Sequence, residues 1–244
     1  MDQPSKWVEP ATSLAEVAER VPGGLAAIAR SGLHRAPLDD SSIEAACARL
    51  GLSVDEAVSV IAKVAEDARH RCEAPLGELD VSDLALRIAR THHAKTFETA
   101  HLALGLARRL ARGQEPLLGT IAELVETLVL ELHAHIDRED RGVLSRARTL
   151  VRHTTPKHTR VGDLERAIHA MQLDHQAVSL LLAELRARAN GYRAPEHASS
   201  LWRGLYELLE ELEADVRFAE WVEEALFFPL VLQLEVDVTR AMAS

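Results

Sequence analysis

Apolar residues recur at intervals of three and four along most of this chain. A clear example within 117–151 is the series Ile121, Leu124, Val125, Leu128 and Leu132. Residues at this spacing share one face of an α-helix, whereas a strand would need strict alternation of apolar and polar positions. Because no such alternation runs for any length, the pattern predicts an all-α protein.

Four long segments carry an apolar stripe of this kind, and they cover 81–112, 117–151, 162–189 and 195–235. Gly113 and Pro116 separate the first two segments, and Asn190 with Gly191 stops the third. Two phenylalanines followed by Pro229 are expected to close or break the fourth segment. Since an apolar stripe needs a facing helix, we expect four antiparallel helices packed as a bundle.

The residues before these segments predict a separate, small helical domain. Three Ser-x-x-Glu capping boxes mark helix starts, in which the serine side chain accepts from a backbone N–H and the glutamate reciprocates. The boxes are Ser13 with Glu16, Ser41 with Glu44, and Ser53 with Glu56. Pro75 and Gly77 then interrupt the chain and indicate a linker. The predicted divisions are an N-terminal domain at 1–71, a linker at 72–80 and the bundle at 81–244.

Composition limits the partners and the location to expect. The formal net charge of −10 argues against a general nucleic-acid binder, because neutralising phosphates requires a basic surface. One basic run, 146–160, is typical of a solvated loop, so no nucleic-acid partner is expected. Cys47 and Cys72 form no CxxC pair, and no segment has the ~20 apolar residues of a membrane span or the core of a signal peptide. We therefore expect a cytoplasmic protein without a membrane partner.

The chain contains twelve histidines, which directs attention to metal chemistry. Each long segment carries a histidine or carboxylate near its middle. These groups are His92 with His93, His135 with Glu139 four residues on, His175, and Glu223. Each alone has an ordinary explanation as a surface ion pair or a buried core histidine. Their occurrence on four helices matches the way in which bundles build carboxylate-bridged di-iron or dimanganese sites.

Three stretches extend this pattern to a known family: "HAHIDRED" at 133–140, "MQLDH" at 171–175 and "DVRFAEWVEEALFFP" at 215–229. Over nearly its whole length the chain resembles the repair-of-iron-centres proteins, a di-iron family with a hemerythrin-like bundle. The resemblance implies a metal-ligand set of His93, His135, Glu139, His175 and Glu223, with Glu139 and Glu223 as bridging carboxylates. It also implies a non-haem iron cofactor of two ions or one, a diatomic ligand or peroxide, an iron–sulfur protein partner and association into a homodimer.

The chain departs from that family at two places. Where the family has a Cys-Cys-Gly-Gly turn, this chain has Ala36, Pro37, Leu38 and Asp39, so thiolate chemistry is not expected there. Where the family has a sixth ligand, a histidine, this chain has Ala219. We expect Trp221 to pack and Glu220 to be a solvated residue. Two candidates for the open position remain: the long carboxylate of Glu220, if it reaches in, and a water molecule.

Two functions follow from these observations. The first is a hemerythrin-like iron protein that handles iron, O2, NO or peroxide and is linked to iron–sulfur cluster repair or stress response. The second is a metal-free, degenerate bundle that acts as a protein-interaction or regulatory module. The two departures from the family favour the second, and the five remaining ligands favour the first, because buried carboxylates are costly without a cation.

Overall fold

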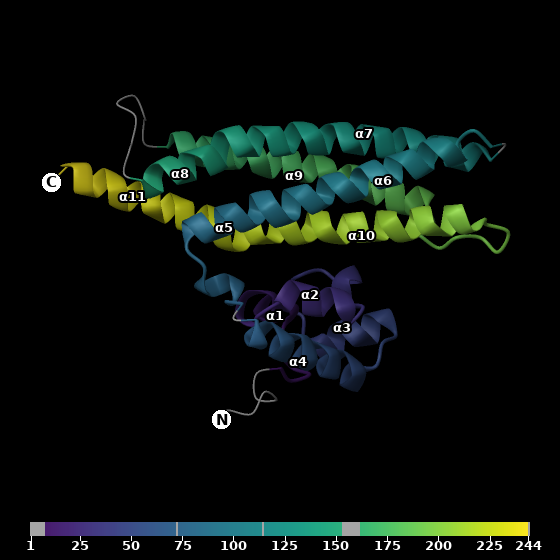
Figure 1. Ribbon diagram of the computed structural model, residues 1–244, viewed down its shortest axis with the longest axis horizontal. Coiled ribbons are helices and arrows are strands. Elements are labelled where there is room, and N and C mark those ends of the chain that lie inside the picture. Colours follow the sequence, from purple (N-terminus) through teal and green to yellow (C-terminus); the bar gives the residue numbers. More distant parts are fainter. Residues whose placement is uncertain (1–7, 72, 114, 153–161, 244) are drawn as a thin grey trace. The chain divides into compact units, whose positions relative to one another are not determined.

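The computed structural model describes residues 8–71, 73–113, 115–152 and 162–243, and Figure 1 shows that helices dominate them. The predicted all-α class is confirmed: the described residues contain no strand and one isolated bridge, between Ser13 and Ser42. The chain divides into two compact units, Met1–Asp80 and Val81–Ser244. Cys72 and residues 153–160 of the basic run lie outside the described residues, so the predictions for them stand as predictions.

The first unit is a small set of short helices around an apolar core. Its elements are α1 (Leu14–Arg20), α2 (Gly24–Arg30), η2 (Leu33–Arg35), α3 (Ile43–Leu50), α4 (Val54–His70) and η3 (Leu76–Glu78). The side chains of Leu14, Ile28, Leu33, Ile43 and Ile61 are fully buried in it. The segment predicted as a linker belongs to this unit, because η3 packs against α1 and Leu76 is buried.

Serine caps begin three of these helices, as the pattern predicts, but one of them lies a residue away from its expected position. Ser13 forms a complete capping box, and the Ser53 side chain accepts a hydrogen bond from the N–H of Glu56. The predicted cap at Ser41 is wrong, because the side chain of Ser42 accepts from the N–H of Ala45. Ser41 instead donates its backbone N–H to Asp39 at 2.9 Å, since a local turn competes with the cap for this serine.

The elements of the second unit are α5 (Val81–Arg87), η4 (Ile88–His93), α6 (Ala94–Leu110), α7 (Pro116–Glu139), η5 (Asp140–Leu144), α8 (Ser145–Val151), α9 (Asp163–Arg188), α10 (Ser200–Val222), η6 (Glu223–Phe227) and α11 (Phe228–Ala243). Helices α6, α7, α9 and α10 are the longest elements of the second unit among the described residues, and they lie beside one another in Figure 1. Helix α7 packs against both α6 and α9, and α10 packs against α6. Their apolar faces form one core, to which α10 adds the buried rings of Trp202 and Tyr206.

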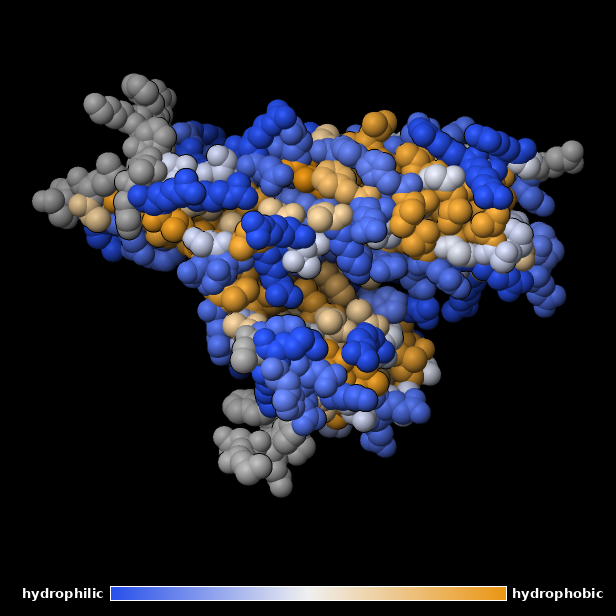
Figure 2. Space-filling model, in the orientation of Figure 1, coloured by the Kyte–Doolittle hydropathy of each residue, from blue (hydrophilic) through white to orange (hydrophobic). Residues whose placement is uncertain are grey.

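The apolar stripe of α7 lies where the spacing predicts. Ile121, Val125, Leu128 and Leu132 are buried, and Leu124 packs at the margin of the same core. Figure 2 shows hydrophilic residues over much of the visible surface, with apolar patches between them. No helix among the described residues is both long enough and apolar enough to cross a membrane.

Of the two outcomes expected at Pro229, the structure shows a break in the α-helix and not the end of the segment. Helix α10 continues through the π-helical turn η6 into α11, which runs to Ala243. In that turn the N–H of Phe228 bonds to the carbonyl of Glu223, five residues back, instead of four. The change of hydrogen-bonding register comes immediately before the proline, whose missing N–H would otherwise break the regular ladder.

Candidate metal centre

Three of the four polypeptide stretches that carry candidate ligands contain a π-helical turn at the candidate residue. The turn η4 ends at His93, η5 begins directly after Glu139, and η6 begins at Glu223. A π-helical turn inserts one residue into the helix, rotates the side chains that follow and occurs often at functional sites. Only the stretch that carries His175 is a regular helix throughout.

One cluster of candidate ligands joins η4 to α7. The Nε2–H of His93 donates to Oε2 of Glu139 at 2.9 Å, although the two residues are 46 positions apart. Both side chains are buried, and Glu139 is not exposed at all. One oxygen of Glu223 belongs to the same group, in which the ligand atoms all lie within 4.8 Å of one another.

A second cluster joins α7 and α9 to the same glutamate. The Nε2–H of His175, on α9, donates a hydrogen bond to Oε2 of Glu223 at 3.0 Å. The ring of His135 lies edge-on to that of His175, with a centroid separation of 4.9 Å. His135, His175 and Glu223 each offer a ligand atom within 4.8 Å of the other two.

The two clusters share Glu223, and Glu139 also approaches both, since its Oε2 lies 4.0 Å from Nε2 of His135. The structure therefore brings together all five residues that the sequence singled out, with two carboxylates among three imidazoles. It also selects between the neighbouring histidines: His93 lies in the cluster, while His92 does not belong to either group. Burial, followed by the charge of Arg87, lowers the pKa of His92 to about 4.

Each clustered histidine directs its Nδ1 toward a further carboxylate, and sequence reasoning missed all three. The pairs are His93 with Asp140 at 3.6 Å, His135 with Asp174 at 3.9 Å, and His175 with Glu224 at 2.8 Å. Every one of these acids directly follows or precedes a predicted ligand in the chain, which is the signal that would have found them. Only the pair of His175 with Glu224 is a hydrogen bond, whereas Nδ1 of His93 and Nδ1 of His135 are buried and make none. A carboxylate that accepts from the outer nitrogen of an imidazole is the usual partner of a metal-bound histidine, because it holds the ring and its tautomer.

The charges in the cluster are strongly coupled. Burial and the neighbouring Glu139 raise the pKa of Glu223 to about 7. Burial acts to lower the pKa of His175, but the hydrogen bonds to Glu223 and Glu224 and the negative charges around the ring together outweigh it, and the pKa rises to about 9. His135 has no such bond, so burial and then the charge of His175 lower its pKa to about 4. Protons bound within the cluster thus offset the repulsion between the two buried carboxylates, Glu139 and Glu223.

The donor set fits a transition-metal centre. The Oε1 atom of Glu139 is buried and makes no hydrogen bond, although a buried carboxylate oxygen normally has a partner. Imidazole nitrogens with bridging carboxylates suit iron, manganese or zinc, and bundles hold paired ions in this way. The first cluster and the second, joined by Glu223, can hold one ion each.

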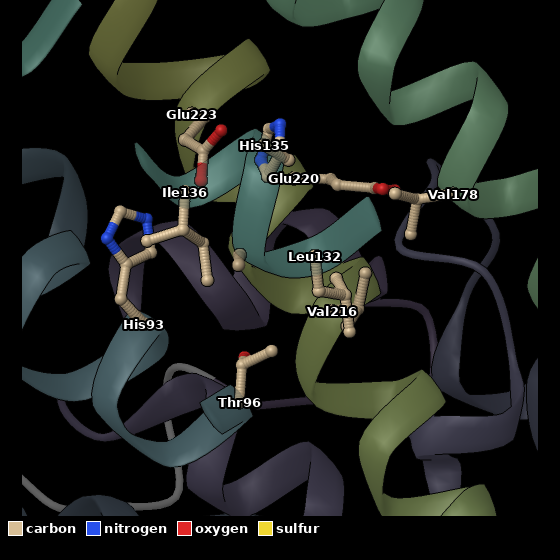
Figure 3. Close-up of a pocket in the computed structure, with 10 residues that line it drawn as sticks. His93, Thr96, Leu132, His135, Ile136, Val178, Val216, Glu220 and Glu223 are labelled. Atoms are coloured by element: carbon tan, nitrogen blue, oxygen red, sulfur yellow. The ribbon is translucent and has the colours of Figure 1, made fainter. Parts of the chain in front are cut away.

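A small cavity of about 20 Å³ adjoins the cluster (Figure 3). Ala219 is one of the residues that line it. Ten residues line it: His93, Thr96, Leu132, His135, Ile136, Val178, Val216, Ala219, Glu220 and Glu223. A space of this size accepts about one water-sized molecule. The cavity therefore lies beside the position where an imidazole at residue 219 would project.

The expectation that Glu220 is solvated is wrong. Its side chain lines the cavity and extends toward Val178 (Figure 3), with Oε2 3.5 Å from the hydroxyl of Ser179. The Oε1 atom is buried and makes no hydrogen bond, and burial raises the pKa of this carboxyl to about 7. Packing of α9 against this part of α10 encloses a residue that the acidic local sequence suggested was exposed. Glu220 is in neither ligand group found among the described residues.

No family model matches the chain, and no curated protein matches its sequence.

Proposed function

We propose that the second unit is a hemerythrin-like bundle that holds non-haem iron, as two ions bridged by Glu223 or as one. The observation that carries this proposal is the shared carboxylate of Glu223. His93 and Glu139 form one group with it and His135 and His175 form the other, and within each group the ligand atoms lie within 4.8 Å of one another. The hydrogen bond between Nδ1 of His175 and Glu224 supports it independently, since a carboxylate in this place is the usual partner of a metal-bound histidine.

The residues of the chain have distinct parts in this proposal. Glu139 and Glu223 bring negative charge to a buried site and bridge the two ligand groups. His93, His135 and His175 supply neutral nitrogen donors once their protons leave. Iron held by these donors would supply redox chemistry toward dioxygen, nitric oxide or peroxide. Leu132, Ile136 and Val178 wall the cavity with apolar surface that limits the entry of water.

The choice of substrate follows from the size and place of the cavity. Its volume admits a diatomic molecule or peroxide and excludes a larger organic substrate. Ala219 leaves open the position next to the cluster, where such a ligand would approach the iron. A link to repair of iron–sulfur centres, with an iron–sulfur protein as partner, rests on the family resemblance. Because Ala36 and Pro37 stand where the family has its cysteine pair, the first unit lacks the paired thiolates of the family for that role.

A second candidate is a metal-free bundle that acts as a protein-interaction module. Two hydrogen bonds favour it, because His93 with Glu139 and His175 with Glu223 satisfy each other without an ion. The raised pKa of Glu223 points the same way, since a proton can replace the cation. This candidate does not explain why Oε1 of Glu139 is buried without a partner, or why Glu224 holds the outer nitrogen of His175.

The metal content of protein purified anaerobically without added metal separates the two candidates. We expect between one and two iron ions per chain by elemental analysis, and an absorption band in the near ultraviolet after exposure to oxygen. Replacement of His175 by alanine should abolish the second ion. A protein that contains no iron as isolated, and takes up none from ferrous salt under anaerobic conditions, would establish the metal-free module instead.

A further inference from the structure

A pair of exposed histidines on the outside of the second unit lies apart from the buried cluster. His101 is on α6 and His133 is on α7, and the two helices pack against each other. Their Nε2 atoms are 3.3 Å apart, although 32 residues separate them in the chain. The rings are nearly perpendicular, with centroids 5.0 Å apart. Two helices thus direct the same atom of two imidazoles at one point on the surface.

The tautomer of one member is set by the backbone. The Nδ1–H of His101 donates to the carbonyl of Phe97 at 2.7 Å, which leaves the lone pair on Nε2 directed at His133. This is the arrangement of metal-bound histidines, whose other nitrogen is held by a carbonyl or carboxylate. The ring of Phe97 also packs on that of His133, with centroids 4.5 Å apart, and limits its rotation. Both imidazoles are therefore positioned before any ligand arrives.

The separation of the nitrogens matches a specific geometry. Two imidazole nitrogens bound to one tetrahedral zinc ion at about 2.0 Å lie about 3.3 Å apart. We propose that His101 and His133 form a second, surface metal site that takes one borderline divalent cation, with Zn²⁺ as the reference ligand and water in the other positions. The site needs no part of the buried centre, because His101 lies about 12 Å along the helix from His93.

Occupation of this site would have a structural consequence. The ion bridges α6 and α7, which hold Thr96 on the wall of the buried cavity and His135 and Glu139 in the cluster. A cation that binds only the folded protein stabilises it by mass action. The surface site thus acts as a clamp between two helices that build the buried centre.

Zinc titration of the protein as isolated, in competition with a chromophoric chelator, tests the proposal. Wild type should bind one more equivalent of Zn²⁺ than His101→Ala or His133→Ala, because chelation by two joined donors exceeds one donor by about a hundredfold. The double variant should bind no more weakly than either single variant. Added Zn²⁺ should raise the melting temperature of wild type and of neither variant.

His70→Ala is the matched control. His70 is an exposed helical histidine whose Nδ1 also contacts the carbonyl four residues back, that of Glu66, at 2.8 Å. Among the described residues, no second imidazole makes a hydrogen bond with it. It should bind zinc as wild type does. The proposal would be overturned if either single variant kept the Zn²⁺ affinity of wild type. It would also be overturned if the losses of Zn²⁺ affinity in the two single variants added up in the double variant. His175→Ala should leave this titration unchanged, so that failure of the buried centre remains a separate result.

Discussion

The Nε2 atom of His175 lies 3.0 Å from Oε2 of Glu223, across the contact between α9 and the π-helical turn η6. The same ring donates from Nδ1 to Glu224 at 2.8 Å, so two adjacent glutamates hold the two nitrogens of one imidazole. Two consecutive helical residues normally project about 100° apart. The π-helical turn that begins at Glu223 is what lets both reach His175.

Replacement of Glu223 by glutamine should remove metal from both ligand groups, since both use its carboxylate. We expect the metal content by elemental analysis to fall below a tenth of the wild-type value. Glu165→Gln, at an exposed position of α9, is the control and should retain full content. A Glu223→Gln protein that kept one ion per chain would show that the two groups do not share this residue.

Replacement of Glu224 by glutamine tests the outer partner of His175. Because glutamine cannot supply the negative charge behind the ring, we expect metal affinity to fall by about 10- to 100-fold. The far-ultraviolet circular dichroism should stay unchanged, since Glu224 is exposed. Chelator competition measures the affinity, and an unaltered value would limit Glu224 to a surface hydrogen bond.

Ala219 can be tested by adding the imidazole that it lacks. Ala219→His places a nitrogen donor one turn before Glu223, so we expect tighter metal binding and slower reaction with a small ligand at the open position. Ala219→Val fills part of the same cavity but adds no donor atom. It should slow the reaction with the small ligand without raising the metal affinity. Stopped-flow absorbance and chelator competition separate the two effects. Equal metal affinity in both variants would contradict the assignment of this position.

A partly buried network of α9, α10 and the loop between them predicts a dependence on alkaline pH. The Tyr192 hydroxyl donates to Glu213 at 2.8 Å, and Arg186 pairs with the same carboxylate. Burial and then the charge of Glu213 raise the pKa of Tyr192 well above its ordinary value. The folded protein therefore keeps a proton that the unfolded chain releases above about pH 10, and this contribution to stability is lost as the pH rises past that point.

Tyr192→Phe should accordingly lower the free energy of unfolding by roughly 2 kcal/mol at pH 7, the cost of losing a hydrogen bond to a charged group. It should also flatten the fall in stability between about pH 9 and 11, within which tyrosine in an unfolded chain titrates. Urea denaturation across that range measures both effects. The metal content should not change, because the network is separate from the ligand groups.

Local chemistry explains why much of the fold follows from the sequence alone. The three-and-four spacing of Ile121, Val125 and Leu128 defines a helical face whatever that face packs against. The cap at Ser13 uses only neighbouring residues, so its box could be read directly. The predicted cap at Ser41 was wrong because Ser42, one residue further on, offers the same kind of side chain to the backbone. A local pattern does not choose between two adjacent serines.

Sequence by itself therefore determined the helical class and placed the candidate histidines and glutamates near the middles of long helices. Spacing alone does not separate His93 from His92, and the tertiary structure places His93 and not His92 in the cluster. Only the tertiary structure decided that Glu220 is enclosed. It also decided which outer acid faces which imidazole. The physical reason is that helix packing and three π-helical turns set these orientations, and both depend on contacts between residues far apart in the chain.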